Sequence, residues 1–179
     1  MTPNSRRQWE QYWQEMIELK FAACYISLYR GYLSNWVTYL GVLKAVASSV
    51  GIAGWAIWRQ YAFAWAVIIA AAQVADALKE VFPFIKRHKA ASELTATYDN
   101  LFIDTQLEWE NIISGRFTDD QITNRLHKLR KLQREAERRN FPEGLAKKPE
   151  LAKQAKEHTE EYFLKTYRSA QSAVDSENL

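Results

Sequence analysis

The chain has 179 residues, and this length fits one small unit better than two folded domains. Its 24 Lys and Arg exceed its 21 Asp and Glu by a net charge of only +3, so the composition does not indicate a nucleic-acid partner and we expect none. Cys24 is the only cysteine, which excludes a disulfide framework and favours a reducing compartment for the soluble parts.

The first 35 residues predict an amphipathic helix. They carry too many charges for a cleavable signal peptide, and the stretch from about Ser5 to Tyr32 contains no proline. Its large apolar side chains keep close to one helical face: Trp9, Tyr12, Trp13, Met16 and Ile17. Such a face either lies at the headgroup level of a membrane or packs against the later helices of the chain.

Residues 36–82 predict a transmembrane hairpin. Two apolar runs, Trp36–Trp58 and Tyr61–Leu78, are separated only by Arg59 and Gln60. Each run has about 18–23 residues, enough to cross a hydrocarbon core of about 30 Å. The aromatic residues near the ends of the runs are typical of a membrane interface: Trp36, Trp55, Trp58, Tyr61 and Trp65. The alternative is a buried hairpin in a soluble protein, because alanine and glycine are abundant in both runs.

The charges that flank the hairpin predict its orientation. The first run is preceded by Arg6, Arg7, Lys20 and Arg30, and the second is followed by Lys86, Arg87 and Lys89. The turn between the runs has only Arg59. Basic residues accumulate on the cytoplasmic side, so both termini are expected in the cytoplasm.

Small residues on the first run predict close helix packing. Ala47 and Gly51 have a small-xxx-small spacing that Gly54 extends, so this face is expected to pack against the other arm of the hairpin or against another subunit of a homo-oligomer. Two charges, Lys44 and Asp76, lie about 15 and 16 residues from the turn and therefore at the same depth.

These polar positions have three interpretations. Lys44 and Asp76 form a pair, or they line the mouth of a pore together with Gln73. In the third, Lys44 reaches the interface and Asp76 marks the end of the second run.

Residues 83–170 predict a cytoplasmic domain of three helices, and no strand pattern occurs, so the fold class is all-α. The first helix runs from about Phe84 to Ile113 and is closed by Gly115. Its expected buried side consists of Leu94, Tyr98, Leu101, Phe102, Trp109 and Ile112.

A capping box of Thr118 and Gln121 opens the second helix of this domain. Its expected apolar stripe consists of Ile122, Leu126, Leu129, Leu132 and Ala136. A loop over Phe141–Pro149 leads to the last helix, from Pro149 to about Ala170, and residues 171–179 are expected to be a frayed tail.

The most basic stretch of the chain, Arg125–Arg139, is the candidate binding surface. Guanidinium and ammonium groups on one helix could contact a phosphorylated ligand or an anionic lipid surface. The candidates are Arg125, Lys128, Lys131, Arg134 and Arg138. The alternative is a solvated face that complements Glu157, Glu160 and Glu161.

No catalytic or cofactor motif is found. Only Gly51 and Gly54 lie close together among the glycines, so no phosphate-binding loop is indicated. The three histidines lie far apart and lack metal-ligand spacing. Glu108 and Glu110 point to different faces and make a poor acid–base pair. We therefore expect neither an enzyme nor a cofactor nor a metal site.

The order of a long aromatic helix, a tight hairpin and trailing charged helices resembles the SLATT family. The resemblance covers roughly Trp9 to Arg168, including Tyr29-Arg-Gly-Tyr32 and the hairpin Trp36–Phe82. It implies a pore-forming or membrane-disrupting effector of bacterial antiphage systems in the inner membrane. It also implies control by a nucleotide signal, through a cyclic-nucleotide ligand or a nucleotide-synthase partner. The rival hypotheses are a membrane anchor that recruits a partner enzyme through its cytoplasmic helices and a soluble helical interaction module.

Overall fold

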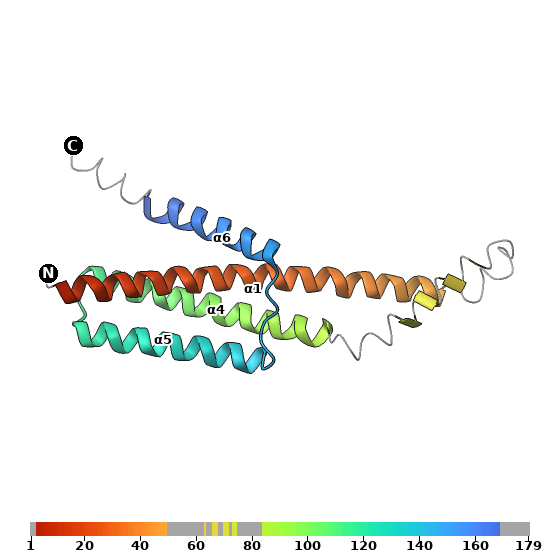
Figure 1. The fold of residues 1–179 in the computed structure, drawn as a ribbon, viewed down its shortest axis with the longest axis horizontal. Coiled ribbons are helices and arrows are strands. Elements are labelled where there is room, and N and C mark those ends of the chain that lie inside the picture. The colour runs from red at the N-terminus through yellow and green to blue at the C-terminus, as the bar shows by residue number, and fades with distance from the viewer. Residues whose placement is uncertain are drawn as a thin grey trace. The chain divides into compact units, whose positions relative to one another are not determined.

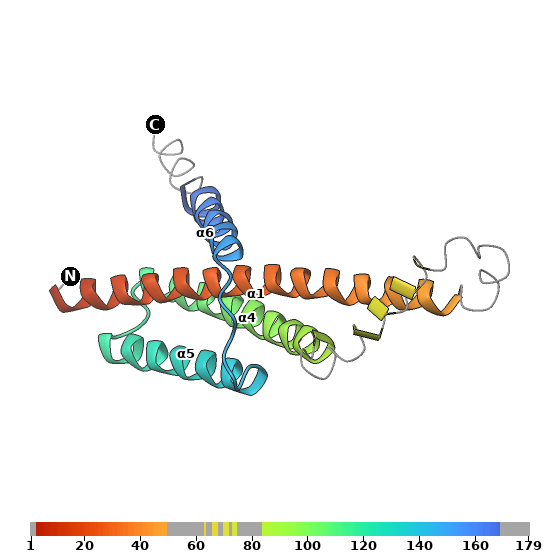
Figure 2. The same ribbon diagram turned by 45° about the vertical axis from the view of Figure 1, so that its right-hand side comes forward.

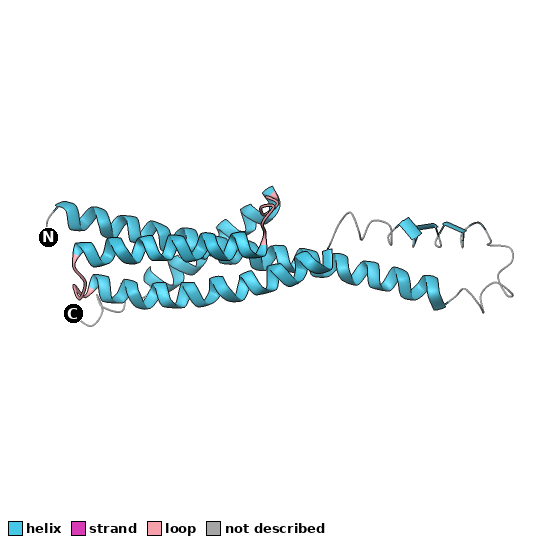
Figure 3. Cartoon of the chain, turned by 90° about the horizontal axis from the view of Figure 1, so that it is seen from below, coloured by secondary structure: helices cyan, strands magenta, loops and turns pink. Residues whose placement is uncertain are grey.

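The computed structural model describes residues 3–49, 63, 66–67, 70–71, 73–74 and 84–168 of the chain. Throughout these residues the regular structure is helical, and the all-α prediction is confirmed (Figure 3). The helices are α1 (Pro3–Ser49), α4 (Phe84–Ile113), α5 (Asp119–Asn140) and α6 (Pro149–Phe163). A π-helical turn, η2 (Leu164–Arg168), follows α6 directly.

The chain divides into two compact units. The first comprises residues 1–29 and 90–179, and the second comprises residues 30–89. Helix α1 contributes to both units, because it continues without a break through Tyr29 and Arg30. Figure 1 shows this helix as the longest of the chain.

The first unit is a helical bundle whose core is supplied by α1, α4 and α5 (Figure 2). Tyr12 of α1, Ile112 of α4 and Ile122 and Leu126 of α5 form one buried cluster, against which Trp9, Trp109 and Phe117 pack. Tyr12 and Met16 are fully buried in the bundle. The aromatic face of the N-terminal helix therefore packs on the later helices, one of the two arrangements that its sequence allowed.

Aromatic rings attach α6 and η2 to the bundle. The ring of Trp13 lies 5.2 Å from that of Phe163 and 5.0 Å from that of Tyr167, between centroids. Phe102 of α4 packs edge-on against Tyr162 at 5.6 Å. The Lys20 ammonium lies 4.1 Å from the centroid of the Tyr162 ring, a cation–π contact that adds to the attachment.

The predicted ends of α4 and the start of α5 are confirmed. Gly115 has φ +71, and the N–H groups of Gly115 and Arg116 donate to the carbonyls of Ile112 and Asn111, each at 3.0 Å. These two bonds form a Schellman motif, which requires the left-handed conformation that glycine adopts without strain. At α5, Thr118 and Gln121 exchange side-chain and backbone hydrogen bonds as a capping box.

Three details of the predicted helices are wrong. Leu132 is 38% exposed, because it lies at the edge of the α5 stripe and lines an open pocket with Ala96 and Thr97 of α4. Leu101 is half-buried on the flank of the buried face of α4, whereas Trp109, also half-buried, packs against the core as predicted. The last helix stops being α-helical at Phe163, where the π turn η2 begins.

The second unit contains the part of α1 from Arg30 onward and the first turn of α4. The rings of Trp36 and Phe84 stack with their centroids 5.9 Å apart, and Leu33 is buried nearby along α1. Among the residues that the structure describes, no helix combines the length and apolar character needed to cross a membrane. The expected turn at Arg59–Gln60 lies outside the described residues.

Candidate functional site

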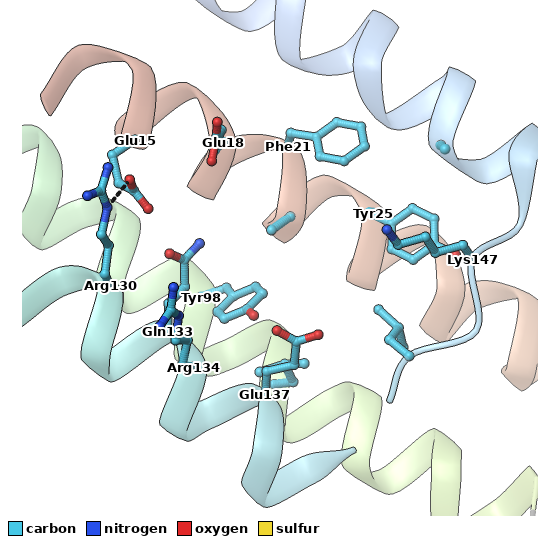
Figure 4. A pocket seen from close by; sticks show the side chains of 14 residues that line it. Glu15, Glu18, Phe21, Tyr25, Tyr98, Arg130, Gln133, Arg134, Glu137 and Lys147 are labelled. Atoms are coloured by element: carbon cyan, nitrogen blue, oxygen red, sulfur yellow. Dashed lines mark hydrogen bonds and ion pairs between the residues drawn. The ribbon is translucent and has the colours of Figure 1, made fainter. Parts of the chain in front are cut away.

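A pocket of about 750 Å³ lies in the first unit between α1 and α5, with α4 as its floor. We call it the α1–α5 pocket (Figure 4). Its floor includes Leu94 and Tyr98, both buried. The remaining lining residues come from α1, α5, the loop before α6 and α6 itself: Glu15, Glu18, Phe21, Ala22, Tyr25, Arg130, Gln133, Arg134, Glu137, Leu145, Lys147 and Ala152.

The pocket arises where large apolar side chains give way to small or polar ones. On α5, Gln133 follows Leu126 and Leu129 on the same helical face, since residues three or four apart are neighbours there. On α1 and α6 the facing positions are Ala22 and Ala152. Because alanine and a partly solvated glutamine fill less space than leucine, the helices leave a cavity at this level.

One end of the pocket is closed by an ion pair. The Nε of Arg130 donates to Oε2 of Glu15 across 2.6 Å, a contact drawn as a dashed line in Figure 4. Glu15 is buried although it carries a charge. Its carboxylate is compensated by the guanidinium, as a buried charge requires.

The other end is closed by the loop between α5 and α6. The Tyr25 hydroxyl donates to the carbonyl oxygen of Ala146 at 2.7 Å and accepts from the N–H of Lys148 at 2.9 Å. Phe141 packs edge-on against Tyr29 at 6.2 Å between ring centroids. Tyr25, through its hydroxyl, and Tyr29, through its ring, thus hold the loop against α1.

Tyr98 and Glu137 lie close together at the middle of the pocket (Figure 4). Burial, and to a smaller extent the negative charge of Glu137, together raise the pKa of Tyr98 to about 12. The phenol therefore keeps its proton at neutral pH and is available as a hydrogen-bonding group.

A second polar cluster lies away from the pocket, around Glu108 of α4. Its carboxylate accepts a hydrogen bond from the Tyr12 hydroxyl at 2.7 Å and pairs with Arg125 of α5. The Arg125 guanidinium also lies 4.2 Å from the centroid of the Phe117 ring. Burial, and then the hydrogen bond to Glu108, raise the pKa of Tyr12 far above its usual value. This cluster is fully paired and has a structural role.

The structure separates the candidate residues of the basic stretch. Arg134 lines the α1–α5 pocket, whereas Arg125 is committed to Glu108. Lys131 pairs with Glu135 at 3.8 Å, and Lys128 and Arg138 are exposed on α5.

Two acidic residues of α6 pair with lysines four positions away in the sequence. Glu160 pairs with Lys156, and Glu161 pairs with Lys165 at 2.6 Å. Arg125 and Arg130 of the basic stretch pair with Glu108 of α4 and Glu15 of α1.

Several of the residues singled out in the predicted hairpin lie outside the residues that the structure describes. Lys44 is half-buried in α1, Gln73 is helical and exposed, and Ala47 lies within α1. Gly51, Gly54 and Asp76 lie outside the described residues. The proposed proximity of Lys44 and Asp76 stays a prediction.

The sequence alone did not single out Arg130, Tyr98 or Glu137 as members of one site. The available signal was Gln133, a polar residue in the middle of an otherwise apolar stripe.

Across the described part of the chain, no group of three His, Cys, Asp or Glu side chains is placed to hold a metal ion. No protein-family model, curated protein or solved structure matches this chain.

Proposed function

We propose that this chain is a membrane effector that oligomerises and permeabilises or perturbs the bacterial inner membrane in antiphage defence. In this proposal residues 36–82 insert as a helical hairpin, and the bundle of the first unit remains in the cytoplasm with both termini. The resemblance to the SLATT family supports the defence role, and the segregation of charge along the chain supports the membrane role.

The observation that carries the proposal is the exposure of large apolar side chains in the second unit. Along α1, Trp36, Tyr39 and Val42 are all exposed, and Tyr39 reaches 70%. In the segment after the expected turn, Phe63 is 83% exposed. Exposed apolar surface of this kind favours contact with lipid or with another protein, because leaving it in water is costly.

The first unit would then control the hairpin. The two units share α1, so a ligand or partner that binds the bundle acts on a helix that also belongs to the second unit. The resemblance implies a cyclic nucleotide or a nucleotide synthase for this role.

Membrane insertion is tested by fractionation and by topology. The untagged chain should sediment with membranes, reporters at both termini should be cytoplasmic, and a cysteine placed at Gln60 should react with an external thiol reagent. Recovery of the chain in the soluble fraction after ultracentrifugation would contradict the proposal and favour a soluble interaction module.

The effector activity is tested by ion flux from liposomes that contain the purified chain. We expect flux with the native chain and a large loss of flux when Trp36, Tyr39 and Val42 are replaced together by serine. Membranes that contain the chain but never leak, at any concentration and with any nucleotide added, would overturn the effector proposal.

The second candidate is a non-enzymatic membrane anchor that recruits a partner enzyme. The exposed cations Lys128 and Arg138 on α5 favour it, since they present charge to the surroundings of the bundle. An anchor would leave liposomes intact, and its partner would be lost from membranes when these two residues are changed to glutamate.

A further inference from the structure

The Tyr98 hydroxyl is a buried polar group that the protein does not satisfy. The side chain is only 5% exposed, yet within the described part of the chain its hydroxyl makes no hydrogen bond. Buried tyrosine hydroxyls usually have a partner, because an unmade hydrogen bond costs on the order of 1–3 kcal/mol. Figure 4 shows the hydroxyl end of this side chain directed into the α1–α5 pocket, toward Glu137.

Part of the pocket wall is apolar and aromatic. Leu94 is fully buried beside Tyr98, and Phe21 and Tyr25 supply rings from α1. The hydroxyl of Tyr25 is already used twice by the loop before α6. The volume of about 750 Å³ falls in the range of small-molecule sites.

Tyr98 and Glu137 together determine which kind of polar group the site favours. The carboxylate attracts the phenolic proton, and the pKa of Tyr98, raised to about 12, keeps that proton in place. The lone pairs of the phenol oxygen and of the carboxylate then remain for an incoming group. Two acceptors and a negative charge are complementary to a positively charged hydrogen-bond donor.

The pocket is also lined by other charged residues. Arg130 is engaged by Glu15 at one end. Arg134 and Lys147 are exposed at the rim, and Glu18 on α1 adds a second carboxylate there. The faces of the aromatic rings add to the attraction for a cation.

We propose that the α1–α5 pocket binds a small organic amine, whose ammonium group donates to the Glu137 carboxylate and the Tyr98 oxygen while its apolar body lies against Phe21 and Leu94. This site belongs to the first unit, and its proposal does not rest on insertion of residues 36–82 into a membrane. A ligand held there contacts α1, α4 and α5 at once and stabilises their packing.

Three probes with similar bodies and different heads test the proposal. They are 2-phenylethylamine, 2-phenylethanol and 3-phenylpropanoate, titrated by calorimetry into the full-length chain in detergent micelles. The amine should bind at least tenfold more tightly than the carboxylate, with the alcohol between them. Tighter binding of the carboxylate would overturn the proposal and assign the pocket to Arg134 and Lys147, and binding of none of the probes would also overturn it.

Two variants of the pocket test the assigned contacts. Glu137→Gln removes the charge and should weaken amine binding about tenfold or more, and Tyr98→Phe removes one acceptor and should weaken it about two- to tenfold. Glu135→Gln is the matched control, since Glu135 lies on the same helix outside the pocket and should leave the amine affinity within about twofold.

Circular dichroism establishes that each variant is folded, and Glu137→Gln changes an exposed side chain, so folding is expected to persist. Equal amine affinities for Glu137→Gln and Glu135→Gln would contradict the proposal. Liposome flux is measured separately on the same variants. If the effector proposal fails, the amine-binding measurements still decide whether the pocket binds an amine.

Discussion

Arg130 of α5 and Glu15 of α1 form an ion pair in which the two partners are unequally buried. The Glu15 side chain is 9% exposed, whereas that of Arg130 is 48% exposed. Removal of the arginine would leave a buried carboxylate alone, and removal of the carboxylate would leave an arginine that water can solvate. The free-energy cost of breaking this contact between the two helices therefore depends on which of the two residues is changed.

Arg130→Ala should therefore destabilise the bundle more than Glu15→Gln. We expect the arginine variant to cost about 1–3 kcal/mol and the glutamine variant less than about 1 kcal/mol, because half of the arginine is already solvated. Urea unfolding followed by circular dichroism measures both. Lys128→Ala is the control, because Lys128 is exposed on the same helix. Equal losses for the two partners would contradict this account of the pair.

Tyr25→Phe should loosen the loop between α5 and α6. The variant keeps the ring but loses both hydrogen bonds to the loop, at about 0.5–1.5 kcal/mol each. Trypsin should then cut more quickly after Lys147, which is exposed in that loop. Tyr39→Phe changes an exposed tyrosine of α1 and should leave the cutting rate unchanged. Identical rates for Tyr25→Phe and the native chain would mean that other contacts hold the loop.

Gly115→Ala should destabilise the end of α4 by about 1 kcal/mol, because its positive φ of +71 disfavours a side chain. The comparison is Gly31→Ala within α1, where an added methyl group has open space around it. Alanine is the better helix former, so this second variant should be neutral or stabilising by up to about 1 kcal/mol. Thermal unfolding of both variants measures the two changes in stability, which should differ in sign unless Gly31→Ala is neutral.

The buried tyrosines predict a loss of stability in alkali. The pKa of Tyr98 rises from an unfolded value of 10.0 to about 12, chiefly by burial and then by the charge of Glu137. The unfolded chain therefore releases the proton first, and the stabilising contribution is complete below pH 10 and disappears as the pH rises toward 12. Unfolding in urea at a series of pH values should show this decline.

Glu137→Gln tests how much the Glu137 charge contributes to the raised pKa of Tyr98. Without the carboxylate charge the pKa of Tyr98 should fall, although burial will still hold it above 10.0. The phenolate absorbance near the alkaline end of a titration, compared with that of Tyr98→Phe, reports this group. An unchanged titration would remove Glu137 as a cause of the shift.

Gly51→Leu tests the predicted assembly of the hairpins. A bulky apolar residue at the small-xxx-small position should block close helix approach and leave insertion intact, because it adds volume and no charge. Crosslinking in membranes should show fewer oligomeric species. If the crosslinked ladder and the flux are unchanged, the interface lies elsewhere on the chain.

Lys44→Asp and Asp76→Lys, separately and together, distinguish the interpretations of the two charges in the hairpin. If the charges pair, each single change should impair assembly and the double swap should restore it. If they line a pore, each single change should alter ion selectivity and the swap should not restore the native value. If both single variants keep native flux and native crosslinking, the pairing and pore interpretations both fail. The remaining interpretation is that Lys44 reaches the interface and Asp76 marks the end of the second run.

The local features of the fold were determined by the sequence itself. The bounds of α4, the Gly115 cap and the Thr118–Gln121 capping box followed from residue types a few positions apart. Such features depend on backbone hydrogen bonds between near neighbours in the chain, so a short stretch of sequence carries all the partners they need.

Only the tertiary structure decided what those helices bring together. Arg130 and Glu15 are 115 positions apart, and the loop residues that Tyr25 holds are 121 and 123 positions away from it. The basic stretch of α5 gave no indication that Arg125 and Arg130 face different carboxylates while Arg134 lines a pocket. Ala22, Gln133 and Ala152 come from three helices and line the same pocket, so the cavity is set by side-chain volumes across these helices and not by the periodicity of any one of them.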